Sequence, residues 1–266
     1  MLKLKHLIIL LSVIVLTSCG RYNRVLNKGS VSDKYKMATE MYDSKKFDKA
    51  LRLFEMITPA YKGKPQMERI QFMVSQSYFN TMDYSNAAYY YEQFAINYPK
   101  SSKREEAVFS SAKSHYLASP KYSVDQTETK EALVAFQKYI NAYPNSKHLQ
   151  EANEMVSLAQ YKLETKAFKI AKQYFDIGYY SSAVVAFDNM TSEYLGTGYR
   201  EEAFFYKFKS AYELSMRSSF TKKHIRLIAA EKAYNKLQRN YPESEYLRES
   251  QGLLEKVQKE LALILS

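Results

Sequence analysis

Apolar residues recur every three or four positions from about Asp33 to the C-terminal end of the chain. A representative stripe on one helix face consists of Ala87, Tyr91, Phe94, Ala95 and Tyr98. Proline and glycine, which interrupt helices, number only six and seven among the 266 residues. This pattern predicts that the body of the protein is helical throughout.

One short pattern returns along this helical body: an alanine, an aromatic residue four positions later, and a tyrosine seven positions after that. Its copies are Ala50-Phe54-Tyr61, Ala87-Tyr91-Tyr98, Ala132-Phe136-Tyr143, Ala183-Phe187-Tyr194 and Ala230-Tyr234-Tyr241. Successive alanines are 37, 45, 51 and 47 residues apart. The alanine lets a partner helix approach closely, and the aromatic ring fills the space beside it. Repetition with this period predicts stacked helix–turn–helix units.

The segments between the copies indicate where the elements end. In three copies the tyrosine precedes a proline, which cannot continue a helix, and a serine follows two residues after that proline. Ser102 and Glu105 have the spacing of a capping box for the following helix. The pattern also predicts an inserted loop over Ala118–Lys130, one long or kinked helix over Lys147–Ile177, a loop over Arg217–His224 and a terminal capping helix over Ser244–Leu265. Residues 33–266 are therefore expected to form an all-α solenoid of about five repeats.

The first 18 residues have the basic, apolar and small order of a secretory signal peptide. The apolar run Leu7–Leu16 is too short for a membrane-spanning helix, which needs roughly 20 apolar residues. Leu16-Thr17-Ser18-Cys19 resembles the lipobox of bacterial lipoproteins, in which cleavage precedes the cysteine and the cysteine carries the lipid. An ordinary signal peptide and a short apolar N-terminus are the alternatives. We expect a signal peptide at 1–18 and a lipidated cysteine with a polar, basic tether at 19–32.

The net charge is +11, and it becomes +9 once Lys3 and Lys5 leave with the signal peptide. A basic excess of this kind can indicate a protein that binds nucleic acid. An exported chain rarely meets nucleic acid, and the sequence has no block of basic residues and no glycine-rich loop. The charge favours a positive surface near an anionic membrane or acidic partners. Solvated helix faces explain it equally well.

The sequence shows no pattern that indicates an enzyme. There are no paired histidines at metal-ligand spacing and no P-loop or dinucleotide fingerprint. Cys19 is the only cysteine, so an internal disulfide is excluded. We therefore expect no catalytic residue, no metal and no cofactor apart from a covalent lipid on Cys19.

One stripe could form a binding surface. Phe72, Gln76 and Phe79 share a helix face, beside a second stripe that contains Ile70 and Val74. The first helix of a repeat contacts both its own partner and the next repeat, so core packing is the simpler explanation. If Phe72, Gln76 and Phe79 instead face the groove of the solenoid, they could hold an apolar peptide.

The order of alanine, aromatic residue and tyrosine–proline resembles the tetratricopeptide repeat, whose basic period is 34 residues. A lipobox, a short basic linker and five such repeats together resemble the BamD family of outer-membrane protein assembly factors, from Cys19 to about Leu254. The segment Ser119–Thr129, SPKYSVDQTET, is similar to the corresponding loop of Bacteroidetes-type members.

This resemblance implies a non-enzymatic subunit of the β-barrel assembly machinery, anchored to the outer membrane by Cys19 and facing the periplasm. It implies that the N-terminal repeats engage unfolded outer-membrane proteins, and that the C-terminal repeats dock the periplasmic domains of a BamA-like barrel subunit. It implies no nucleic-acid partner.

Other functions remain as alternatives. A periplasmic repeat lipoprotein of another envelope complex, such as the Tol-associated scaffold, has similar tyrosine–proline repeats but a coiled-coil segment ahead of them. Nutrient-binding lipoproteins of the starch-uptake type are about twice as long. An enzyme would require a polar constellation that this sequence does not show.

Cys19→Ala should abolish acyl labelling and release the protein from the membrane, because the thiol is the attachment point that the lipobox implies. Each buried methylene of an acyl chain contributes about 0.8 kcal/mol, so several chains anchor a protein firmly. Fatty-acid labelling followed by membrane fractionation measures both effects. A variant that stays membrane-bound would contradict the anchor.

Overall fold

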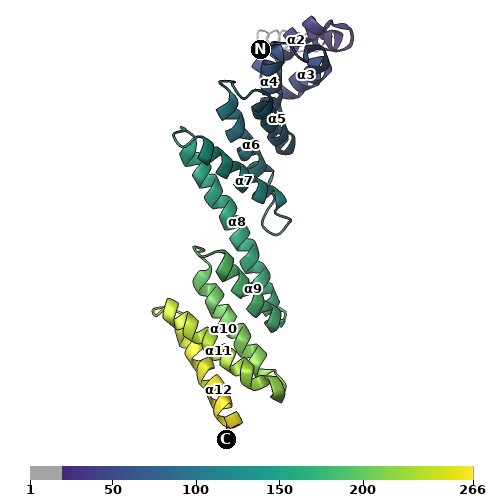
Figure 1. Cartoon of the computed structure of the whole chain (residues 1–266). Coiled ribbons are helices and arrows are strands. Elements are labelled where there is room, and N and C mark those ends of the chain that lie inside the picture. The colour runs from purple at the N-terminus through teal and green to yellow at the C-terminus, as the bar shows by residue number, and fades with distance from the viewer. Residues whose placement is uncertain (1–19, 266) are drawn as a thin grey trace, which may run out of the picture. The chain divides into compact units, whose positions relative to one another are not determined.

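The computed structural model describes residues 20–265, which form helices joined by turns, with no strand among these residues (Figure 1). After a helical segment at residues 20–28, the helices are α2 (Val31–Asp43), α3 (Phe47–Tyr61), α4 (Gln66–Asn80), α5 (Tyr84–Asn97), α6 (Arg104–Ala118), α7 (Thr127–Ala142), α8 (Leu149–Asp176), α9 (Tyr180–Glu193), α10 (Arg200–Met216), α11 (Phe220–Asn240) and α12 (Leu247–Leu265). No helix in this described part has the length and apolar character that crossing a membrane requires. The predicted all-α fold is confirmed.

The helices pack into two compact units. The first contains the described residues up to Pro120 together with Thr127–Val156, and the second contains Lys121–Gln126 together with the chain from Ser157 onward. The division falls inside α8, the long helix that the sequence predicts over this region.

The repeat pattern corresponds to the cores of both units. The alanines Ala50, Ala87, Ala132, Ala183 and Ala230 all have an exposed fraction of 0%. The aromatic residue four positions later is buried in every copy, from 0% exposed at Phe54, Phe136 and Phe187 to 5% at Tyr234. Consecutive helices such as α2 and α3, or α10 and α11, pack against each other, and the aromatic rings fill the space beside the alanines. The tetratricopeptide-like repeats are thus confirmed.

The turns inside three repeats share one backbone geometry. Each has three residues, and the middle residue lies in the left-handed region: Lys45 with φ of 57°, Met82 with 63° and Gly178 with 83°. In the first of these turns, the Lys45 and Lys46 N–H groups donate to the Tyr42 and Met41 carbonyls, at 2.9 and 2.8 Å. These are the paired bonds of a Schellman motif, which satisfies the last carbonyls of a helix.

Most of the turns between repeats share a hydroxyl, although the turn at residues 62–65 has none. In four of them the hydroxyl oxygen accepts the backbone N–H two residues later, at 3.0 to 3.2 Å, and the four residues are Ser101, Ser146, Thr197 and Ser244. The turn at Thr197 has no proline. The predicted capping box of Ser102 and Glu105 is wrong, because Lys103 is the N-cap of α6 and Ser101 supplies the hydroxyl.

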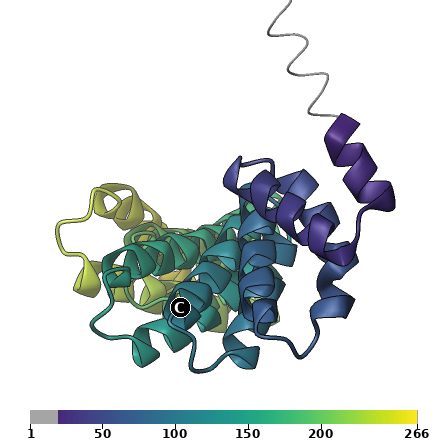
Figure 2. The ribbon, with the colours of Figure 1, turned by 90° about the horizontal axis from the view of Figure 1, so that it is seen from above.

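The predicted tether is the main difference between sequence and structure. Residues 20–28 are helical, and Tyr22 and Leu26 are only 6% and 7% exposed within the core that α2 and α3 also form. Figure 2 shows this helix in purple at the outer end of the first unit. Tyr22, Val25 and Leu26 form a short apolar stripe at helical spacing, which the surrounding basic residues obscure in the sequence.

The other predicted segments largely agree with the structure. The helices predicted over Lys147–Ile177 and Ser244–Leu265 correspond to α8 and α12. The inserted loop is shorter than predicted, because α7 begins at Thr127. The loop predicted over Arg217–His224 is wrong beyond residue 219, where Ser219 takes the N-cap position and α11 begins.

Replacing Gly178 with alanine should lower the free energy of unfolding by about 1–2 kcal/mol, because a Cβ strains a left-handed backbone. Gly196→Ala is the matched control, since a Cβ would meet open space at either glycine but only Gly178 has a positive φ. Urea unfolding followed by circular dichroism measures the difference. Equal effects of the two substitutions would show that the backbone at residue 178 is not constrained.

Candidate functional site

Phe72, Gln76 and Phe79 lie on α4 in the first unit, as the sequence predicts, but they have different environments. The Phe72 ring is 8% exposed and packs on Phe94, with ring centroids 5.1 Å apart, so the core explanation holds for most of this side chain. Phe79 is half-buried against Tyr84 and Tyr91. Gln76 is half-buried between polar neighbours.

Two grooves meet at Gln76. The larger, about 1000 Å³, lies between α4, α6 and the turn before α8, and its walls include Phe79, Tyr91, Phe109, Lys113 and His148. The smaller, about 550 Å³, lies beside α2 and α4, and its walls include Tyr42, Arg69, Phe72 and Lys103. Gln76 lines both. We call these the large groove and the small groove. The structure therefore brings all three predicted residues to a groove wall, although Phe72 contributes mainly to the core.

A polar chain through Gln76 links the first helices of three successive repeats. The Tyr42 hydroxyl of α2 donates to Gln76 Oε1 on α4. The Gln76 side-chain amide in turn donates to Glu106 Oε1 on α6 through a long contact of 3.5 Å. Glu106 also pairs with Lys103 at 2.9 Å. The amide of Gln76 is thus oriented from both sides, and its nitrogen carries a second N–H beyond the one that Glu106 accepts.

The opposite wall of the large groove is also hydrogen-bonded. The Ser146 hydroxyl donates to Glu105 at 2.6 Å and accepts from Tyr139, since a serine has only one proton to give. The His148 ring stacks on Phe109 with centroids 4.4 Å apart and planes at 13°. The Lys113 ammonium pairs with Glu151 at 2.7 Å. These contacts hold the aromatic and charged groups of this wall in fixed orientations.

Burial raises the pKa values of phenols in these walls and of Tyr139 beside them. Burial raises the pKa of Tyr42, and the nearby carboxylates of Asp43 and Glu106 raise it further. Burial also raises the pKa values of Tyr91 and Tyr139. Phenols are neutral at pH 7 in any case, and the raised pKa values keep these hydroxyls able to donate hydrogen bonds to a higher pH than usual. The charged groups of the walls carry both signs, which suits a peptide better than a ligand of one charge.

Sequence reasoning missed Tyr42 and Glu106. Tyr42 lies at the end of a helix and outside the repeat pattern, while Glu106 belongs to a pair of glutamates that suits the first turn of a helix. Only the folded structure brings them to the same glutamine. The predicted lipid anchor, Cys19, lies outside the described residues.

Comparisons with known proteins agree on one family. Residues 27–227 match the YfiO family, described as "Outer membrane lipoprotein". Similar proteins include the "Putative outer membrane protein assembly factor BamD" of Aquifex aeolicus, 27% identical over 184 residues, which are 66% of this chain and 58% of that protein. The BamD of Haemophilus influenzae is 20% identical over 184 residues, covering 65% of this chain and 70% of that protein. The BamD of Rickettsia prowazekii is 22% identical over 216 residues, covering 81% and 82%.

Tyr42→Phe should lower the free energy of unfolding by about 0.5–1.5 kcal/mol, because it removes the hydroxyl that donates to Gln76. Tyr89→Phe is the matched control, since the Tyr89 side chain is 56% exposed on α5. Urea unfolding of both variants at pH 7 measures the difference. If the two substitutions had the same effect, the chain through Gln76 would not stabilise the groove.

The difference between wild type and Tyr42→Phe should also shrink above pH 10. The pKa of Tyr42 is raised from its usual 10.0, so the folded protein holds this proton more tightly than the unfolded chain does. The stabilisation that comes from this raised pKa is therefore complete below pH 10, and it is lost as the pH rises through the folded-state pKa of Tyr42. A difference that does not change with pH would contradict the role of this proton.

Proposed function

Because the chain belongs to the YfiO family of outer membrane lipoproteins, we propose that it is a non-enzymatic scaffold subunit of the machinery that assembles outer-membrane β-barrel proteins. Three relatives carry the name outer membrane protein assembly factor BamD. The chain spans 58% of the length of the Aquifex relative, so its activity and partners are part of this proposal.

The observation that carries the proposal is the pair of grooves that meet at Gln76. Unfolded barrel proteins are extended chains with unpaired backbone groups, alternating apolar side chains and charges of either sign. The walls offer an oriented amide at Gln76, the half-buried ring of Phe79 and charges of both signs at Glu106 and Lys113. Groups that hydrogen-bond to a peptide backbone and aromatic-lined grooves are both used in the recognition of extended peptides. We propose that unfolded outer-membrane proteins bind here.

The second unit offers a separate surface for a folded partner. A shallow groove of about 370 Å³ on this unit is lined mainly by small apolar side chains, among them Val185 and Ala229. Val185 is 56% exposed, and Lys232 and Lys236 also line the groove. An apolar centre with charged groups beside it is typical of a protein–protein contact. We propose that the periplasmic domains of a BamA-like barrel subunit dock on this surface.

The proposal also includes an anchor that holds the protein close to the outer membrane. The N-terminal helix supports this part. A lipid on Cys19 would be attached three residues before Tyr22, which is packed in the core of the first unit. Three extended residues span at most about 11 Å. The lipid would therefore hold the first unit within a short distance of the periplasmic surface of the outer membrane, rather than on a long tether.

Depletion of the protein should lower outer-membrane barrel proteins of many kinds together, because a shared assembly factor serves all of them. Quantitative mass spectrometry of outer-membrane fractions measures this effect, and inner-membrane proteins are the control. Normal barrel levels after depletion would rule out the assembly function. A selective loss of Tol-associated partners would instead favour a scaffold of that type.

In-cell photocrosslinking tests the two surfaces separately. A photoreactive residue at Asn80, which lines the large groove, should capture unfolded barrel proteins, whereas one at Met56, 48% exposed on α3, should not. A photoreactive residue at Val185 should capture a BamA-like subunit, with Leu195, 70% exposed, as its control. Equal capture from a site and its control would contradict the assignment of that surface.

A further inference from the structure

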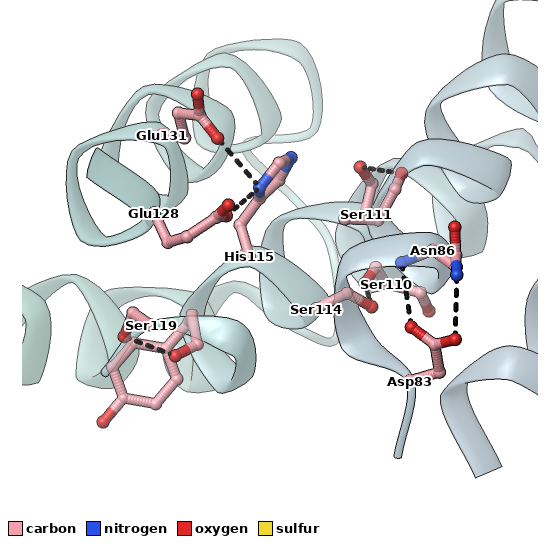
Figure 3. A network of polar contacts seen from close by, with 11 residues as sticks. Asp83, Asn86, Ser110, Ser111, Ser114, His115, Ser119, Glu128 and Glu131 are labelled. Carbon is pink, nitrogen blue, oxygen red and sulfur yellow. Dashed lines mark hydrogen bonds and ion pairs between the residues drawn. The ribbon is translucent and has the colours of Figure 1, made fainter. Parts of the chain in front are cut away.

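His115, Glu128 and Glu131 bring metal-ligating atoms together between α6 and α7 (Figure 3). His115 lies in the last turn of α6, and Glu128 and Glu131 lie near the start of α7. One ligand atom from each residue lies within 4.8 Å of the others. We call these three residues the His115 cluster.

The geometry of the His115 cluster suits a small metal ion. His115 Nδ1 lies 3.2 Å from Glu128 Oε2 and 3.5 Å from Glu131 Oε2. Ligand atoms of a tetrahedral zinc centre with bonds of about 2.0–2.1 Å lie about 3.3–3.4 Å from one another. Two of the three separations are thus close to those of a coordinated ion. The third separation is between the carboxylate oxygens of Glu128 and Glu131. The Glu131 side chain is 51% exposed, so it can move to bring this separation into the same range.

The two carboxylates of the His115 cluster favour a cation between them. Glu128 and Glu131 are three residues apart on one helix, so both carboxylates project from the same face. Both contact the same imidazole nitrogen, which can carry only one proton. A divalent ion would neutralise both carboxylates at once, which a single N–H cannot do.

The His115 cluster also opens to solvent. His115 and Glu131 line a groove of about 750 Å³, together with Val134 and Ile96. A fourth coordination position is therefore accessible to water. Among the other polar side chains in Figure 3, Asp83 bonds Asn86 at 2.8 Å and Ser114 donates to the Ser110 carbonyl at 2.6 Å, whereas Ser111 donates to the Ala88 carbonyl on α5 at 2.9 Å.

The position of the cluster in the repeat suits a structural role. The other four repeats close with three-residue turns, whereas α6 and α7 are joined by the longer segment 119–126. The His115 cluster lies where this segment leaves α6 and enters α7. An ion there would link the two helices directly.

We propose that the His115 cluster binds one divalent transition-metal ion of the zinc type. His115 Nδ1 and one carboxylate oxygen each from Glu128 and Glu131 are the protein ligands, and water completes the tetrahedron. Mixed nitrogen and oxygen donors are a common zinc set. The bound ion stabilises the helix pair α6 and α7, because a ligand that binds only the folded state raises its stability.

The test uses the full-length protein in detergent, stripped of metal with a chelator and titrated with Co²⁺ and then with Zn²⁺. One equivalent of Co²⁺ should produce the visible absorption of a four-coordinate ion, and Zn²⁺ should displace it. Zn²⁺ should also raise the melting temperature. The absence of saturable one-to-one binding would overturn the proposal and indicate that these residues form only a histidine–carboxylate ion pair.

Variants assign the site. His115→Gln and Glu131→Gln should each weaken Zn²⁺ binding by more than about tenfold, because each removes a ligand. Even the loss of a residue that only supports a ligand typically lowers metal affinity by at least about tenfold. His148→Gln is the matched control, because His148 Nδ1 faces a single carboxylate, Glu151, at 3.7 Å. Glu131 is exposed enough that its variant should fold even if His115→Gln does not, and circular dichroism checks both. One-to-one binding that survives both substitutions would overturn the proposal.

Discussion

Two helices can approach only as closely as the side chains between them allow, and in every repeat the residue at this contact is an alanine. These alanines are completely buried, and the aromatic residue one turn later fills the space that the close approach leaves at the side. The grooves depend on this contact. Because the pairs stack closely, Tyr42, Gln76 and Glu106 come from three successive first helices and still form one chain of contacts.

That polar chain orients hydrogen-bonding groups at the walls of both grooves. Gln76 is oriented from both sides by its neighbours, and burial raises the pKa of the Tyr42 phenol that donates to it. The walls therefore present hydrogen-bonding groups and aromatic faces in fixed positions. Preorganised walls reduce the entropy lost when a flexible chain binds. This property fits the proposed role in holding unfolded barrel proteins.

The turns show how the repeats tolerate variation in length. Three of the three-residue turns contain a left-handed residue, and four of the longer turns between repeats close with a hydroxyl. The segment between α6 and α7 fits neither type, and the His115 cluster lies at its base. The N-terminal helix at residues 20–28 extends the first unit, because a short stripe that includes Tyr22 and Leu26 is enough to pack it on the core.

The sequence by itself determined most of the helices, the repeat contacts and the number of repeats, because the alanine and aromatic positions recur at helical spacing and are buried in every copy. It also identified α4 as the helix that carries Gln76. The helix at residues 20–28 escaped prediction because its stripe is short and surrounded by basic residues, and Lys45 and Met82 adopt turns that usually take glycine. Only the tertiary structure brought Tyr42 to Gln76 and His115 to Glu131, since these pairs are separated by a helix or a turn whose geometry no local pattern specifies.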